Sequence, residues 1–125
     1  MNVARNFLVM GSLYLVIGIA IGMYMGATGN HDLAIVHAHI NLLGFTLMAV
    51  FGIAYKVFPA MAEGNLARYH FYLHAVGSLI LLVLLFLLMS GMAGEAIMMP
   101  LAPISELLVF IGVLIFAYNA YSKAN

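Results

Sequence analysis

The chain has 125 residues, of which 66% are apolar and only 6% are charged, and its formal net charge is zero. A soluble domain carries about 25% charged residues, so this chain lacks the polar surface that water requires and falls in the membrane class. The absence of cysteine excludes disulfides, thiolate metal sites, iron–sulfur clusters and thiol catalysis, and the zero net charge leaves no basic field for nucleic acid.

Four apolar segments are long enough to cross a bilayer, which takes about 20 residues per helix. Strands are excluded because an open sheet leaves backbone groups unpaired in lipid, and the short polar linkers force neighbouring helices to run antiparallel. We therefore predict an all-α membrane protein, with a single four-helix transmembrane domain over residues 1–125. The predicted helices span about 6–26, 34–60, 68–90 and 101–121.

Basic residues gather on one side of the predicted bundle. None lies in the first or the third linker, which carry Asp32 and Glu95 instead. The positive-inside rule then places both termini and the second linker in the cytoplasm, and we expect the membrane to be a bacterial inner membrane. The basic residues are Arg5, Lys56, Arg68 and Lys123.

The first predicted helix, 6–26, carries Gly18, Gly22 and Gly26 at four-residue spacing. Small residues at this spacing let another helix backbone approach closely. The pattern fits a seam between subunits and packing within one chain equally well.

The second predicted helix, 34–60, contains His37 and His39, two residues apart. Ionisable residues inside a membrane are costly and are candidates for function. Residues two positions apart on an α-helix differ by ~200° of rotation, so the two imidazoles point in nearly opposite directions. They cannot bind one metal from one face, and the pair suits a site shared between helices or between subunits.

Each histidine of this pair has its own helical face. Asn41, Gly44 and Met48 follow His37 along one face, because residues three and four apart are neighbours on a helix. Asn41 can hydrogen-bond nearby polar groups, and Gly44 would leave a flat gap in which a planar macrocycle fits. The alternative is that both histidines only hydrogen-bond across helices.

The third predicted helix, 68–90, carries His70 and His74 on one face, at a spacing that can bind one metal ion. Both lie nearer the inner surface than His37, so they do not readily share its site. His74 is a candidate ligand, whereas His70 fits an interfacial anchor. Arg68 either pairs with a cofactor carboxylate or is an ordinary basic residue at the cytoplasmic helix end.

The second predicted helix reads VHAHINLLGF and then FGIAYKVFP. This segment resembles the His-x-His helix of heme–copper oxidase catalytic subunits (subunit I), in the branch of the C-type oxidases and nitric oxide reductases. The likeness includes a Gly-x-x-Tyr-x-x-x-Pro-like close at Gly52, Tyr55 and Pro59. The segment RYHFYLHAVG, 68–77, resembles the next helix of that family more weakly. The chain looks like a small four-helix relative of that subunit, matched over about half its length.

The resemblance implies noncovalently bound heme b. In that family the first histidine of the pair binds the high-spin heme iron and the second binds the low-spin heme iron, which by resemblance are the roles of His37 and His39. The family's copper-ligand helix has no counterpart here, so copper is not expected. Its catalytic subunit has three units of four helices, so a homotrimer would rebuild it; a dimer through the glycines is the alternative. The candidate cofactor contacts are His37, His39, Asn41, Gly44, His74 and Arg68.

These features predict a membrane heme b protein that transfers electrons or binds a diatomic gas, with heme held between subunits and a possible redox partner. Stand-alone oxidase activity is not expected. The alternatives are a non-heme structural or assembly subunit of a respiratory membrane complex, and a small ion transporter with His70, His74 and Glu106 on its path. His31, in the first linker, is solvated, caps the second helix or contacts heme propionates.

Overall fold

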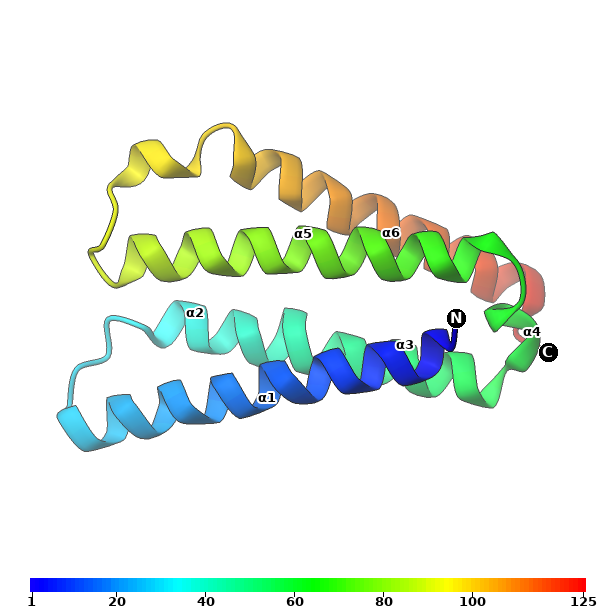
Figure 1. Cartoon of the computed structure of the whole chain (residues 1–125), viewed down its shortest axis with the longest axis horizontal. Coiled ribbons are helices and arrows are strands. Elements are labelled where there is room, and N and C mark those ends of the chain that lie inside the picture. The colour runs from blue at the N-terminus through cyan, green and yellow to red at the C-terminus, as the bar shows by residue number, and fades with distance from the viewer.

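The structure is a computed structural model that describes residues 1–125. It is all-helical, and four helical segments are long and apolar enough to cross a membrane (Figure 1). These segments confirm the predicted fold class, and each lies within a few residues of its predicted position. They are α1 (Val3–Thr28), α2 (Ala34–His39) with η1 (Ile40–Thr46) and α3 (Leu47–Val57), α5 (Asn65–Met89), and η2 (Glu95–Met98) followed by α6 (Leu101–Lys123).

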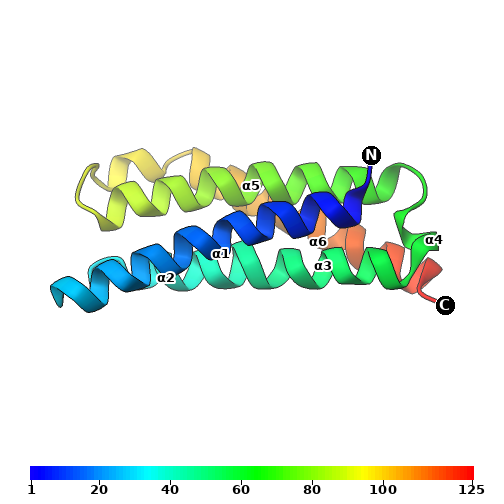
Figure 2. The same cartoon turned by 60° about the horizontal axis from the view of Figure 1, so that its bottom comes forward.

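The bundle consists of two antiparallel helical hairpins. In the first hairpin α1 packs along α2, η1 and α3, and in the second α5 packs along α6. Contacts of α5 with α1 and α2 join the hairpins, and the two views agree on this arrangement (Figures 1 and 2). Both termini lie at the same end as the short helix α4 (Pro59–Ala62). All four basic side chains therefore belong to the elements at or near that end, as the charge pattern predicts.

The ends of α1 follow from two local signals. Asn2 caps the first turn by accepting a hydrogen bond from the Arg5 backbone N–H at 3.0 Å, which satisfies one of the free donors of a helix N-terminus. Gly29 ends the helix with φ of 71°, a left-handed conformation that glycine adopts at little cost. Its N–H bonds to the carbonyl of Met25 at 2.9 Å, so the turn to the second span begins there.

The second span differs from a uniform α-helix in two places. Residues Ile40–Thr46 form a π-helix directly after the histidine pair, where the Thr46 hydroxyl donates to the carbonyl of Asn41, five residues back, at 2.9 Å. Phe58 then leaves helical geometry, because the residue before a proline is pushed out of the α region. The span therefore ends at Val57 rather than at residue 60.

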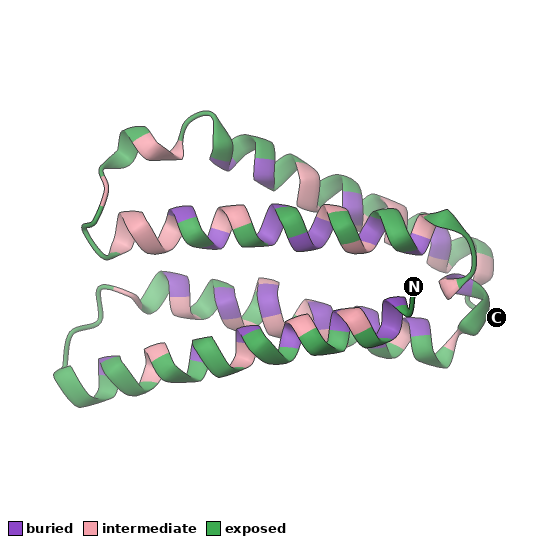
Figure 3. Cartoon of the chain, in the orientation of Figure 1, coloured by how far each residue is buried: buried purple, intermediate pink, exposed green.

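Most apolar side chains face outward. Only 17% to 28% of the residues in each membrane span are buried inside the chain, and the exposed faces of the helices are dominated by leucine, isoleucine, valine and aromatic residues. Figure 3 shows exposed residues along the outer faces of all the long helices, with buried residues where the hairpins meet. Exposed apolar faces of this extent suit a lipid bilayer.

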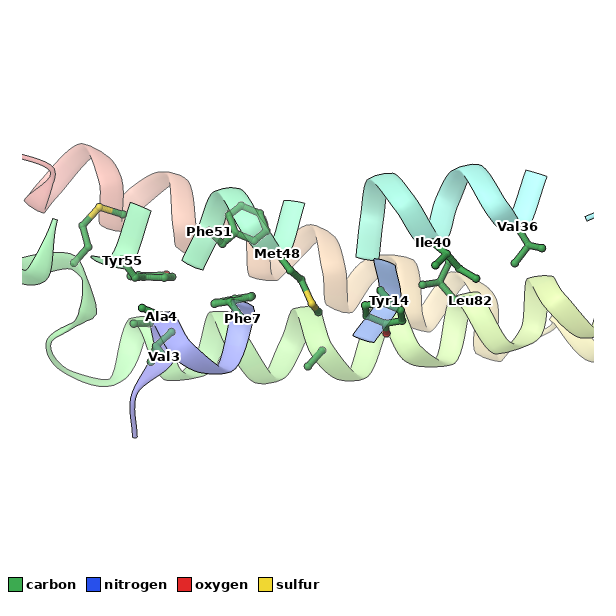
Figure 4. Packing of buried hydrophobic residues seen from close by; sticks show 13 residues of the cluster. Val3, Ala4, Phe7, Tyr14, Val36, Ile40, Met48, Phe51, Tyr55 and Leu82 are labelled. Carbon is green, nitrogen blue, oxygen red and sulfur yellow. The ribbon is translucent and has the colours of Figure 1, made fainter. Parts of the chain in front are cut away.

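The buried core runs along the inner face of α1. At the end of the bundle that carries both termini the core is aromatic: the Phe7 ring stacks on Tyr55 with centroids 5.9 Å apart and meets Phe51 edge-on at 5.5 Å (Figure 4). Toward the opposite end the core becomes aliphatic, with Ile40 and Leu82 near Tyr14. The aromatic end thus supplies rigid, closely packed surroundings for any polar group placed there.

Close packing within the chain accounts for most of the glycine pattern on α1. A Cβ on Gly18 would collide with Asn41, and a Cβ on Gly22 would lie 2.9 Å from Cε1 of His37. Gly26 has open space around it. Gly18 and Gly22 therefore allow α1 to pack closely against the second span of the same chain. Of the three glycines, only Gly26 remains free to contact another subunit.

Alanine at Gly44 is expected to lower stability by roughly 1–3 kcal/mol, the usual cost of overpacking. A Cβ there would lie 2.6 Å from Cγ of Tyr14, so the ring or the helices must shift. The matched control is Gly26→Ala, where no atom lies within 4 Å and helix propensity favours alanine by about 1 kcal/mol. Denaturation of both variants in detergent, followed by circular dichroism, checks this; equal stabilities would contradict the packing described here.

Candidate functional site

His37 projects from α2 toward α1. Its Nδ1 lies 2.8 Å from the carbonyl oxygen of Gly18, and a carbonyl can only accept, so Nδ1 carries the proton. The Nε2 atom is then a lone-pair nitrogen, and its one contact is the side-chain amide of Asn41 at 3.3 Å. This contact is long for a hydrogen bond, so His37 is held firmly through one nitrogen and weakly through the other.

His39 faces away from the chain. Its side chain is exposed, and its Nδ1 lies 2.8 Å from the carbonyl oxygen of Ile35, one turn earlier on the same helix. That bond again fixes the proton on Nδ1 and leaves Nε2 as an acceptor on the lipid-facing surface. The two histidines therefore point in different directions, as their rotation on the helix predicts.

Asn41 and Gly44 lie below His37 but do not frame an open gap. The Asn41 side chain packs against Gly18, and its Oδ1 is buried without a hydrogen-bond partner. The Tyr14 ring fills the space over Gly44. The expectation of a macrocycle-sized gap beneath His37 is therefore wrong within one chain, because a side chain from α1 already occupies it.

Two cavities lie between the hairpins at the end opposite the termini, and both are lined by Ile17, Ile21 and Phe86. One, of about 320 Å³, is lined entirely by apolar side chains of α1, η1 and α5. The other, of about 550 Å³, is also lined by polar residues of the first linker and the end of α5. Neither is lined by His37 or His39, so the histidine pair lies outside both cavities.

The remaining candidates lie apart from the histidine pair. His74 is fully buried, and its Nε2 lies 3.0 Å from the carbonyl of Leu43 in η1. Arg68 is exposed near the start of α5, at the other end of the bundle from α2 (Figure 1). The structure thus brings Asn41 next to His37 and leaves His74 and Arg68 at other places.

His70 is the centre of a buried aromatic cluster that the sequence did not single out. The Tyr55 hydroxyl lies 2.9 Å from its Nδ1, and the rings of Phe51, Phe7 and Phe116 surround it at centroid distances of 4.4, 4.9 and 5.3 Å. The interpretation of His70 as an interfacial anchor is wrong, because its side chain is 0% exposed. The available signal was its helical alignment with His74 and the apolar face between them.

Two other ionisable candidates stay at the surface. His31 is exposed, and its Nδ1 lies 2.9 Å from the carbonyl of Gly29; its ring does not cap α2, whose N-cap residue is Leu33. Glu106 is exposed on α6 and forms no ion pair. No group of three or more histidine or acidic side chains is arranged to hold a metal ion.

Comparisons with protein-family models, with curated proteins and with solved structures found no match to this chain.

Proposed function

We propose that this chain is a membrane heme b protein in which His37 and His39 supply axial ligands at sites between copies of the chain. The proposal rests on a hydrogen bond to a backbone carbonyl that both histidine side chains form. Each imidazole donates its Nδ1 proton to a backbone carbonyl at 2.8 Å. That second-sphere bond selects the tautomer and orients Nε2, as is usual for histidines that ligate metals.

The donor atoms suit heme iron. His39 Nε2 has no partner within the chain and stands on the lipid-facing surface, where an apolar macrocycle is well solvated. His37 Nε2 must give up only the 3.3 Å contact with Asn41. In the bilayer, bare imidazole nitrogens are costly, so a ligand for them is expected.

The arrangement favours a site between subunits. The two imidazoles diverge, and neither lines one of the two cavities between the hairpins, so we propose that a second copy completes the enclosure. A heme between two copies, bound by His39 of one copy and His37 of the other, would account for the different directions of the two side chains. By the resemblance to heme–copper oxidase subunit I, whose twelve helices form three units of four, we propose a homotrimer in the inner membrane with cytoplasmic termini.

Heme bound in this way supplies one-electron redox chemistry. Binding of the iron by both histidines would favour electron transfer, whereas binding by one histidine would leave room for a diatomic gas. The chain's own part is to hold each imidazole in one tautomer and to exclude water through its apolar faces. By the resemblance, the copper-ligand helix has no counterpart in this chain, so we propose no oxygen reduction by the chain alone.

A second candidate is a non-heme structural or assembly subunit. It is favoured by the hydrogen bonds of His37 to Gly18 and of His74 to Leu43, which join different helices. In this case the histidines stabilise the bundle, because an interhelical hydrogen bond in a membrane contributes about 0.6 kcal/mol. The exposed imidazole of His39 has no role in such a protein.

Absorption spectra of detergent-purified protein separate the two candidates. A heme b protein gives a sharp alpha band in the reduced-minus-oxidised spectrum and a b-type pyridine hemochrome, with one heme per chain. Native mass spectrometry then gives the number of chains, for which we expect three. A colourless protein after expression with ample heme supply overturns the proposal, and one heme per trimer contradicts the shared-ligand arrangement.

A further inference from the structure

The buried pair His70 and His74 has one unpaired nitrogen on each ring. His70 Nε2 and His74 Nδ1 have no hydrogen-bond partner, although both side chains are 0% exposed. Buried polar atoms of native proteins nearly always have a partner, either in the protein or in ordered water. Two such atoms on neighbouring rings of one helix face therefore indicate a ligand that the two share.

The partner of the other nitrogen fixes the tautomer of His74, whereas the tautomer of His70 depends on the direction of its hydrogen bond with Tyr55. The Leu43 carbonyl can only accept, so His74 carries its proton on Nε2, and Nδ1 is left as an acceptor. The Tyr55 hydroxyl has His70 Nδ1, at 2.9 Å, as its hydrogen-bond partner. When the phenol donates to Nδ1, His70 carries its own proton on Nε2. The unpaired atoms are thus one donor and one acceptor.

The two rings are neighbours on α5 that share no direct hydrogen bond. Their centroids are 6.1 Å apart. A water that accepts from one nitrogen and donates to the other spans two bonds of about 2.8 Å each. The surrounding Phe51 and Phe116 rings offer no polar atom that could replace it. Gly112 adds no side chain there; a Cβ would lie 3.5 Å from Cδ2 of His70.

We propose that one water molecule lies between His70 Nε2 and His74 Nδ1 and completes a buried proton relay. The relay runs from the Tyr55 hydroxyl through His70 and the water to His74, whose other ring nitrogen donates to the carbonyl of Leu43 in η1. It begins two residues before the end of α3 at Val57 and reaches the π-helical segment of the second span. This site is separate from the proposed heme ligands and does not depend on them.

The relay moves a proton without any other reactant. A proton that arrives at the Tyr55 oxygen releases the hydroxyl proton to His70 Nδ1. The His70 Nε2 proton passes to the water, and a water proton passes to His74 Nδ1. One proton enters, no bond between heavy atoms changes, and His74 ends with a proton on both nitrogens.

Solid-state NMR of 15N-histidine-labelled full-length protein in liposomes tests the water directly. We expect both buried rings to be protonated at Nε2, with magnetisation passing from water to the His70 Nε2 proton as fast as to exposed His31. Absence of that transfer, while His31 shows it, overturns the proposal. No variant is needed for this measurement, so misfolding cannot obscure it.

Exchange into deuterated water tests the relay. Tyr55→Phe removes the hydroxyl at its inner end, and the His70 Nε2 proton is expected to exchange several-fold more slowly than in the unmodified protein. Tyr14→Phe is the matched control, because Tyr14 is also buried and its hydroxyl bonds to Ser78 at 3.2 Å, outside the relay. Equal exchange rates in the two variants overturn the relay.

Discussion

The His39→Ala variant is expected to lose the alpha band and the pyridine hemochrome of the purified protein almost completely. The reason is the position of His39: its side chain is exposed on the lipid-facing surface, and its Nδ1 bond to Ile35 leaves Nε2 available to iron. Removing an axial ligand from a noncovalently held heme removes its main anchor. Since no other polar atom of the chain bonds to this imidazole, the fold is expected to survive.

Two variants control for nonspecific loss of heme. His31→Ala removes another exposed imidazole whose Nδ1 also bonds to a backbone carbonyl, at 2.9 Å, but which lies in a linker; its spectrum is expected to stay unchanged. His37→Ala is expected to lose heme as well, because a neighbouring copy then lacks the second ligand. Unchanged spectra in both His37→Ala and His39→Ala would refute the ligand assignment.

The largest loss of stability is expected from His70→Ala. The imidazole is fully buried among aromatic rings, so its removal leaves a cavity and deprives the Tyr55 hydroxyl of its partner. Truncating a buried side chain of this size costs about 3 kcal/mol, and an unpaired hydroxyl adds roughly 1–3 kcal/mol. Unfolding in increasing mole fractions of a denaturing detergent, followed by circular dichroism, measures the difference.

Neighbouring and size-matched variants separate these contributions. Tyr69→Ala changes a side chain that is 54% exposed and next to His70, so it is expected to alter stability by less than about 0.5 kcal/mol. His70→Phe keeps the volume but leaves the Tyr55 hydroxyl unpaired, and its stability is expected to fall between the two. A His70→Ala variant as stable as Tyr69→Ala would contradict the buried cluster.

The bundle itself was predictable because its causes are local. Long apolar runs, polar linkers and basic residues at alternate linkers are read along the chain, and they predict four antiparallel spans with both termini at one end. The divergence of His37 and His39 follows likewise from helical rotation alone. The membrane orientation, the heme and the oligomer stay predictions, because no contact within a single chain depends on them.

Side-chain partners could not be predicted, because they join segments far apart in the sequence. The spacing of Gly44 below His37 indicates an open gap, yet Tyr14 from another helix fills it. The positions of His70 and Tyr69 look equally interfacial, yet one is enclosed by three phenylalanine rings and the other is exposed. Which residue is buried depends on how the helices are turned toward each other.

The amino-acid sequence by itself determined that this protein has four helices long and apolar enough to span a membrane and carries a histidine pair whose members face different directions. The periodicity and apolarity of each segment suffice for that. Only the tertiary structure decided that both Nδ1 atoms of the pair bond to backbone carbonyls, that a π-helix follows them, and that His70 and His74 are buried with one unpaired nitrogen each. These features require a carbonyl, a ring or a glycine from another turn or helix to stand at hydrogen-bonding or van der Waals distance.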